Sequence, residues 1–266
     1  MIGSALPDHP ALHSALITYI GNKRALLSLI WEGLHYLETH EGPLQTMADP
    51  FTGSGVVARL GRLAGLEVYA GDIEDYTRPF GTAFLETTRE EAEELYAPWG
   101  GYQAVLDHLN SLTTPVREED LYFTRHYAPA DTAAADPNRE RLFYTRENAL
   151  RSDAMAAAIH RGELGPADAR SRRRDILLAS LLVEMSVHNN TSGVMKGFHH
   201  GWGGRGGDAL GRIMAPVELE ALPFLEGPRG RMHVGPAHQL PHPADGRPFD
   251  VTYLDPPYTI HQYGAN

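Results

Sequence analysis

The chain has 266 residues, no cysteine and a formal net charge of −11. The lack of cysteine excludes a disulfide framework and a metal site built on thiolates. No apolar stretch approaches the roughly 20 residues needed to span a bilayer, and the first residues carry neither a basic start nor an apolar block. We therefore expect a cytoplasmic protein without a membrane segment, long enough to bury a sizeable core.

The charge is distributed unevenly along the chain. Residues 1–150 carry 22 acids against 11 bases, whereas residues 151–212 carry 9 bases against 6 acids. The overall balance argues against nonspecific coating of a polyanion. If a polyanion binds, we expect it to contact the later segment.

The first 76 residues predict a helix and then a strand–helix–strand unit. ITYIGNKRALLSLIWEGLHYLETHEG (17–42) indicates a short extended entry and a helix that Gly42 ends. LQTMADPF (44–51) predicts a strand, TGSG (52–55) a loop, VVARLGRLAG (56–65) a helix and EVYAGDIEDY (67–76) a second strand with acids at its end. This succession is typical of a mononucleotide-binding βαβ unit.

The middle of the chain differs in character. Residues 77–190 show helical patterns and no strand alternation of any length, so we interpret them as a helical insertion. Residues 193–208 hold seven glycines and predict a loop of special backbone geometry. Strand-like sequence resumes in RMHVGPAHQL (231–240) and FDVTYLDPPY (249–258).

The loop after the first strand has the spacing G-x-G-x-x-A, with Asp72 at the distance expected for an acid that binds a ribose. A tight connection without any ligand remains the alternative, and the absence of Gly-Lys-Ser/Thr excludes a P-loop. Asp49 stands just before the glycines, where it would repel a pyrophosphate but suit a cation. S-adenosylmethionine carries an ammonium and a sulfonium and no phosphate, so Asp49 favours that cofactor over a nicotinamide dinucleotide.

Three motifs in order, TYIGNKR (18–24), DPFTGSG (49–55) and DPPY (255–258), resemble those of the adenine-N6 DNA methyltransferases, the D12 class of DNA adenine methylases. The stretch NTSGVMKGFHHGWGG (190–204) is similar to a segment of one bacterial branch. The resemblance implies an α/β fold: a Rossmann-like doubly wound sheet with a helical target-recognition insertion. Residues 1–76 and 229–266 would form the catalytic domain that binds S-adenosylmethionine, and residues 77–228 the insertion that contacts double-stranded DNA.

The resemblance also assigns roles to residues at the cofactor site. Lys23 would meet the carboxylate of S-adenosylmethionine, Asp72 the ribose hydroxyls, and Ile73 the cofactor adenine. A solvated lysine on the first turn of a helix is the alternative for Lys23. The full cofactor set implied by the motifs is Tyr19, Gly21, Lys23, Asp49, Phe51, Gly53, Gly55, Asp72 and Ile73.

DPPY suits chemistry on an exocyclic amine, whose lone pair is delocalised into the ring. Asp255 and a backbone carbonyl, that of Pro256, would accept its two N–H groups, while the Pro256–Pro257 pair stiffens the loop and removes backbone donors. Tyr258 would stack on the base. The adenine would have to be flipped out of the duplex. A proline-stiffened turn that closes a strand is the alternative interpretation.

Two segments are candidates for DNA contact. SRRRD (171–175) places Arg172, Arg173 and Arg174 before an apolar helix with Asp175 as its N-cap, and arginines there suit phosphates better than they suit the helix dipole. A solvated surface run is equally open. The glycine-rich loop adds Lys196, His199, His200, Trp202 and Arg205. Paired histidines without nearby cysteine or well-spaced acids do not predict a metal site.

The site residues leave alternatives open. The same four residues occur in enzymes that methylate cytosine N4 or a protein glutamine, and a non-catalytic chain that binds cofactor or DNA is a further alternative. The resemblance implies further helices and strands after DPPY. We therefore expect a fragment, or a second chain that completes the fold, with poor activity alone and with a sheet edge and apolar surface exposed. Restriction-modification or genome marking in a prokaryotic cytoplasm, near the nucleoid, would be its setting.

Overall fold

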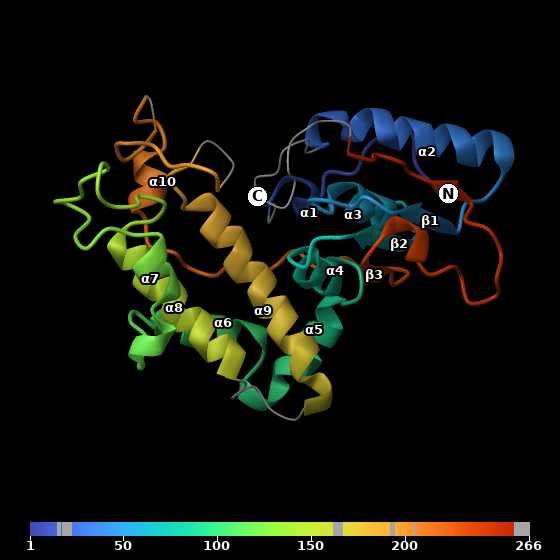
Figure 1. The fold of residues 1–266 in the computed structure, drawn as a ribbon. Coiled ribbons are helices and arrows are strands. Elements are labelled where there is room, and N and C mark those ends of the chain that lie inside the picture. Colours follow the sequence, from blue (N-terminus) through green and yellow to red (C-terminus); the bar gives the residue numbers. More distant parts are fainter. Residues whose placement is uncertain (15–16, 18–22, 162–166, 192–194, 205, 258–266) are drawn as a thin grey trace. The chain divides into compact units, whose positions relative to one another are not determined.

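The computed structural model describes residues 1–14, 17, 23–161, 167–191, 195–204 and 206–257 (Figure 1). The chain forms two compact units. Among the described residues, unit 1 comprises 1–14, 23–93 and 222–257, and unit 2 comprises residue 17 and the described part of Glu94–Ala221. The sequence placed these limits at 76/77 and 228/229. Unit 1 extends further on both sides because the helix after residue 76 packs against its sheet.

Unit 1 contains a parallel sheet, with four strands in its described part in the order β3-β2-β1-β4. The strands are β1 (Thr46–Asp49), β2 (Glu67–Asp72), β3 (Arg231–Val234) and β4 (Val251–Thr252). Met47 in β1 lies opposite both Val68 in β2 and Val251 in β4. The chain therefore moves outward from β1 to β3 and returns to the other side of β1. This is the order of a doubly wound α/β sheet and confirms the predicted fold class.

The helices of unit 1 pack on this sheet and on one another (Figure 1). Helix α3 follows β1 as the glycine loop predicted, and its apolar residues Val56, Val57 and Leu60 are buried. Gly61 allows its close approach, because a Cβ there would lie 2.7 Å from the Met47 sulfur. The helices are α1 (Pro10–His13), α2 (Leu27–Glu41), α3 (Val56–Leu63) and α4 (Thr77–Phe84), with 3-10 turns at Arg24–Leu26 and Ala237–Gln239.

A buried arginine of unit 1 links α3 to the end of α4 and to the segment before β3. Arg62 of α3 is 1% exposed and donates from Nε to the Pro228 carbonyl, from Nη1 to that of Phe84 and from Nη2 to that of Gly227. These bonds join the end of α4 to the segment that leads into β3. Burial lowers the pKa of Arg62, and the charges of Glu226 and Glu91 oppose that shift. The segment before β3 therefore belongs structurally to unit 1.

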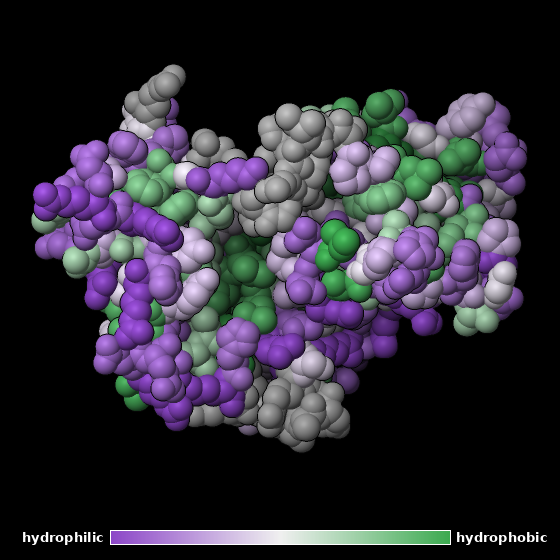
Figure 2. All heavy atoms as spheres, viewed as in Figure 1, coloured by the Kyte–Doolittle hydropathy of each residue, from purple (hydrophilic) through white to green (hydrophobic). Residues whose placement is uncertain are grey.

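Part of the surface of unit 1 is apolar. Figure 2 shows hydrophobic atoms among hydrophilic ones near α2. Leu26 and Leu29 there are 44% and 65% exposed. Strand β4, which pairs only with β1 among the described strands, forms one edge of the sheet.

The regular elements in the described part of unit 2 are all helices, as the sequence predicted. Asp153 of α8 accepts hydrogen bonds from the backbone N–H groups of Phe123 and Thr124 and so caps α7. Its elements are α6 (Tyr102–Ser111), α7 (Tyr122–His126), α8 (Arg146–Arg161), α9 (Ala167–Val187) and α10 (Leu210–Met214), with 3-10 turns at Ala97–Trp99 and Glu118–Asp120; α5 (Arg89–Tyr96) spans the limit between the units.

The start of α9 differs from the prediction. The sequence indicated a helix that begins after Asp175, but α9 begins at Ala167, so Asp175 lies inside the helix and the N-cap assignment is wrong. The stretch before it contains Ala and Arg, which favour helix strongly enough to extend the element backwards. The three arginines therefore do not crowd a helix N-terminus.

Candidate active site

Three acids meet at the carboxyl edge of the sheet in unit 1. Asp49 ends β1, Asp72 ends β2, and Asp255 follows β4. The N–H of Tyr253 donates to the Ala48 carbonyl at 2.9 Å, which carries the pairing of β4 with β1 one residue past the strand. Burial is the main cause that raises the pKa of Asp49, and the charges of Asp72 and Asp255 add to that shift. Both of these acids, which the sequence selected from separate motifs, therefore lie within electrostatic reach of Asp49.

Asp49 is the most buried of the three. Its side chain is 1% exposed, and within the described part of the chain neither carboxylate oxygen has a hydrogen-bond partner of good geometry. Burial raises the pKa of Asp49 to about 7; the nearby Thr52 hydroxyl and the backbone N–H of Phe51 oppose that shift without offsetting it. A buried carboxylate without a partner is costly for a folded chain. The arrangement suits a ligand that brings positive charge to this position.

The glycine loop holds Asp72 in place. Gly53 and Gly55 have φ of 50° and 76°, a left-handed backbone that other residues rarely adopt. The N–H of Gly53 donates to Asp72 Oδ2 at 2.8 Å, and the N–H of Glu74 donates to Oδ1 at 3.1 Å. Gly55 precedes the first turn of α3, whose backbone donors face the loop. Ile73, next to Asp72, is 70% exposed, which leaves an apolar side chain at the end of β2.

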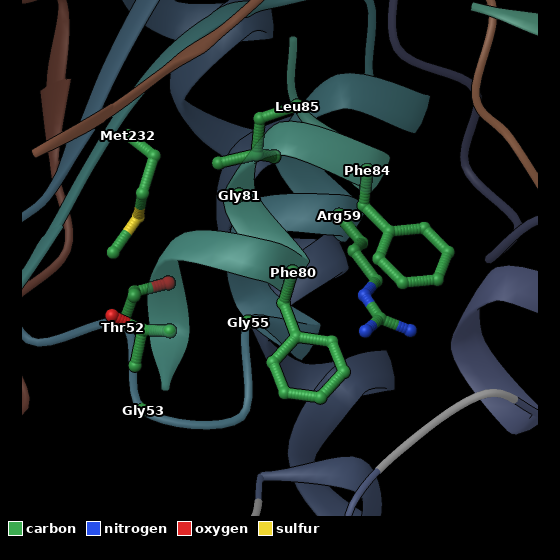
Figure 3. Close-up of a pocket in the computed structure, with 10 residues that line it drawn as sticks. Thr52, Gly53, Gly55, Arg59, Phe80, Gly81, Phe84, Leu85 and Met232 are labelled. Carbon is green, nitrogen blue, oxygen red and sulfur yellow. The ribbon is translucent and has the colours of Figure 1, made fainter. Parts of the chain in front are cut away.

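A small pocket adjoins this loop. In Figure 3, Arg59 lies beside the ring of Phe84, with Phe80 below them and Met232 on the other side of Gly81. The Arg59 guanidinium lies 3.5 Å from the centre of the Phe84 ring, and burial lowers its pKa to about 9. The lining combines loop, α3, α4 and β3: Thr52, Gly53, Gly55, Arg59, Thr77, Phe80, Gly81, Phe84, Leu85 and Met232.

Asp255 forms an ion pair with Lys23, and the strand that leads to it is anchored by Asp250. Its Oδ2 lies 2.5 Å from Lys23 Nζ, with side chains that are 23% and 15% exposed. At the start of β4, Asp250 Oδ2 accepts from the N–H groups of Gln45 and Thr46, each at 2.8 Å, and from the Thr46 hydroxyl. These bonds anchor the beginning of β4 beside β1. The next prolines, Pro256 and Pro257, are exposed.

The predicted DNA contacts all belong to unit 2 and do not share one environment. Arg173 is 7% exposed, donates from Nε to the Leu95 carbonyl at 2.7 Å, and lies 4.9 Å from the Trp99 ring centre. Its described contacts are internal. Arg174 is exposed and 3.4 Å from Asp175, while Arg172 is half-buried.

The glycine-rich loop is held by one buried side chain. Asn190 Nδ2 donates to the carbonyls of Leu142 at 3.0 Å and His199 at 3.1 Å, and the N–H of His199 donates to the Asn190 carbonyl. Trp202 Nε1 donates to the Thr132 carbonyl at 3.0 Å. These bonds fix the loop on the segment between α7 and α8, and Lys196 and His200 are exposed on it.

Four predicted site residues, Tyr19, Gly21, Arg205 and Tyr258, lie outside the described residues. Where the structure can be searched, no three His, Asp or Glu side chains gather as a metal site. The helices it describes include none that is both long and apolar enough to cross a bilayer.

Sequence reasoning missed Arg59 and Asp250. Arg59 stands three residues after Val56 and one before Leu60, on the apolar side of the predicted α3, and that placement was a usable signal. Asp250 had no such signal, because the backbone N–H groups that donate to it lie more than 200 residues away in the sequence. Only the pairing of β4 with β1 brings them together.

The sheet order, the glycine loop after β1 and the acid that ends β2 define a doubly wound, Rossmann-like α/β protein. The family model of the D12 class N6 adenine-specific DNA methyltransferases matches residues 19–204, and the chain belongs to this family. The family match confirms the resemblance that the three motifs indicated.

Curated relatives agree with the family. The chain is 29% identical over 252 residues to modification methylase LlaI of Lactococcus lactis subsp. lactis, covering 92% of the chain and 36% of that protein. It is 27% identical to type II methyltransferase M.NlaIII of Neisseria lactamica and 24% identical to M.CviAII of Paramecium bursaria Chlorella virus 1, in each case over 94% of the chain and 66% of the relative. The chain thus spans between about one third and two thirds of their length. No solved structure matches it significantly.

The buried acid predicts a pH-dependent cost in stability. The folded pKa of Asp49, about 7, lies above the ordinary value of 3.8, so its contribution to stability falls as the pH rises from about 4 to about 7 and is constant above that. Asp49→Asn has no such cost. Its stability relative to the wild type should increase over this range by up to about 4 kcal/mol, at 1.36 kcal/mol per pKa unit.

Urea denaturation of the ligand-free protein at pH 4.5 and pH 8 measures this difference. Glu41→Gln, at the exposed end of α2, is the control for a lost negative charge. A stability difference for Asp49→Asn that stays constant with pH would contradict the buried-acid interpretation.

Proposed function

We propose that this chain, as part of its enzyme, transfers a methyl group from S-adenosylmethionine to the N6 amine of adenine in duplex DNA. The carrying observation is the buried carboxylate of Asp49 beside the Asp255-Pro256-Pro257 loop, at the carboxyl edge of a doubly wound sheet. Membership of the D12 class supports this activity. Ligands of open α/β sheets bind at this edge, which agrees with the proposal.

The residues at the edge fit S-adenosylmethionine. Asp49 has no hydrogen-bond partner of good geometry within the described residues and would accept the positive methionine end of the cofactor. Asp72, oriented by the N–H of Gly53, would take the ribose hydroxyls, and the exposed Ile73 would cover one face of the cofactor adenine. Phe51 and the two loop glycines would line the cofactor site. The cofactor supplies an electrophilic methyl group on sulfonium.

Asp255 would act on the amine of the substrate. Its carboxylate accepts one N–H of the adenine amine and the Pro256 carbonyl accepts the other, which draws the nitrogen lone pair out of the ring and toward the methyl carbon. The C–N bond forms as the S–C bond breaks, and the nitrogen releases one proton to solvent. Tyr258 would stack on the base, an interaction of about 1–3 kcal/mol. Positioning and fixed charges carry this mechanism, and no covalent enzyme intermediate is needed.

The target nitrogen lies inside the duplex, so the adenine has to be flipped out before reaction. Unit 2 would supply the contacts that hold the DNA. Arg174 and Lys196 are exposed there and are our candidates for phosphate contact, with His199 and Arg172 nearby in sequence. The names of the relatives, modification methylase and type II methyltransferase, favour a role in restriction-modification, and the two bacterial relatives agree with a setting in the cytoplasm of a prokaryote.

Methyl transfer is tested by incubating the protein with duplex DNA and S-adenosylmethionine labelled in the methyl group. Nucleoside analysis should place the label on adenine N6. Asp255→Ala should lower the rate by at least about a thousandfold, because the amine loses its acceptor, while calorimetry shows cofactor binding preserved. Label on cytosine or on protein would contradict the proposed substrate, and full activity of Asp255→Ala would refute the site.

Phosphate contact by unit 2 is tested through the salt dependence of DNA binding. Each lost phosphate contact should make the slope of log affinity against log salt about 0.9 shallower. We expect this for Arg174→Ala and for Lys196→Ala, and about twice the change for the double variant. Arg139→Ala, which removes a cation that is 86% exposed in the same unit, is the matched control. An unchanged slope in the double variant would exclude these two residues from the DNA interface.

A further inference from the structure

The ion pair between Lys23 and Asp255 joins two motifs that are far apart in the sequence. Lys23 precedes the 3-10 turn that leads into α2, and Asp255 follows β4, yet Nζ and Oδ2 lie 2.5 Å apart. Both side chains are mostly shielded, at 15% and 23% exposed. A charge-assisted contact this short between shielded groups fixes both side chains.

The pair also matters for the charge of the edge. Asp49, Asp72 and Asp255 bring three carboxyl groups together, and the charges of the latter two raise the pKa of Asp49. The ammonium group of Lys23 places a positive charge next to Oδ2 of Asp255. To bind a cofactor carboxylate, Lys23 would have to break its ion pair with Asp255. The three acids would then lack the positive charge of Lys23.

We propose that Lys23 is a positioning residue for Asp255 rather than the contact for the cofactor carboxylate that the family resemblance implies. The inference rests on the proposed function. The terminal torsion of an aspartate is broad, so a free carboxylate samples many orientations. Lys23 holds Oδ2 and leaves Oδ1 as the acceptor for one N–H of the substrate amine. Asp255 is thereby oriented before the base arrives, which is where positioning contributes to rate.

Lys23→Met and Lys23→Arg separate the two roles. A positioning role predicts that calorimetry finds the dissociation constant of S-adenosylmethionine within about twofold of the wild type in both variants. The single-turnover rate at saturating cofactor and DNA should fall by at least about 30-fold in Lys23→Met, and Lys23→Arg should recover a substantial part of it because arginine keeps the charge. Arg78→Met, which removes an exposed cation of α4, should change neither quantity.

Cofactor affinity at least tenfold weaker in Lys23→Met, with the saturated rate intact, would overturn the proposal and return Lys23 to the cofactor. An unchanged rate and affinity would also overturn it.

A second measurement does not depend on activity. In the ligand-free protein, Lys23→Met should lower the denaturation midpoint in the wild-type background but not in the Asp255→Asn background, since the pair is already broken there. Equal shifts in the two backgrounds would overturn the pairing itself.

This measurement also distinguishes the two proposals. If the enzyme that contains this chain transfers no methyl group to DNA, the proposed function fails. Coupling to Asp255 together with unchanged cofactor affinity would still uphold Lys23 as the partner of Asp255, and lost affinity would still refute it.

Discussion

The carboxylate of Asp49 is buried at the end of the central strand of unit 1, without a hydrogen-bond partner of good geometry among the described residues, and its pKa rises to about 7. That shift corresponds to a cost of about 4 kcal/mol at neutral pH, a large share of the stability of an ordinary domain. The parallel sheet buries this position, because β1 ends between β2 and β4. A cationic ligand at this position would recover much of that free energy, which accounts for an acid here.

The three acids differ in exposure, and the difference separates their proposed roles. Asp49 is buried, whereas Asp72 and Asp255 are half-buried. Asp72 is oriented by the N–H groups of Gly53 and Glu74, and Asp255 by Lys23. The buried acid and the glycine loop therefore suit the cofactor. The acid on the proline-stiffened loop suits a substrate amine, and Asp72 and Asp255 are held by neighbours of different kinds.

Much of unit 1 could be predicted from the sequence because its signals are local. The glycines after β1 and the apolar face of α3 marked the strand–loop–helix connection, and both stand in the structure as predicted. The motifs also placed Asp49 and Asp72 at strand ends, where β1 and β2 end. Strand β4 contains only two residues of the predicted strand, and the bond from the N–H of Thr46 to Asp250 anchors its start beside β1.

The sequence did not predict which distant groups the charged side chains contact. Arginine is usually a surface residue, so the sequence gives no sign that Arg62 and Arg173 are buried. Only tertiary packing brings backbone carbonyls to their guanidinium groups. The predicted start of α9 was wrong for a related reason. A plausible N-cap at Asp175 was given more weight than the helix propensity of the residues before it. Lys23 was assigned by motif to a ligand, whereas the fold gives it a protein partner.

The most direct test of the account is the number of protons released when S-adenosylmethionine binds at pH 6, measured by calorimetry in buffers of different ionisation enthalpy. With a pKa of about 7, Asp49 is mostly protonated in the free protein at this pH and would ionise beside the cationic cofactor. The account predicts that the wild type releases about 0.9 proton more per cofactor than Asp49→Asn does. Equal proton release by the two proteins would contradict it.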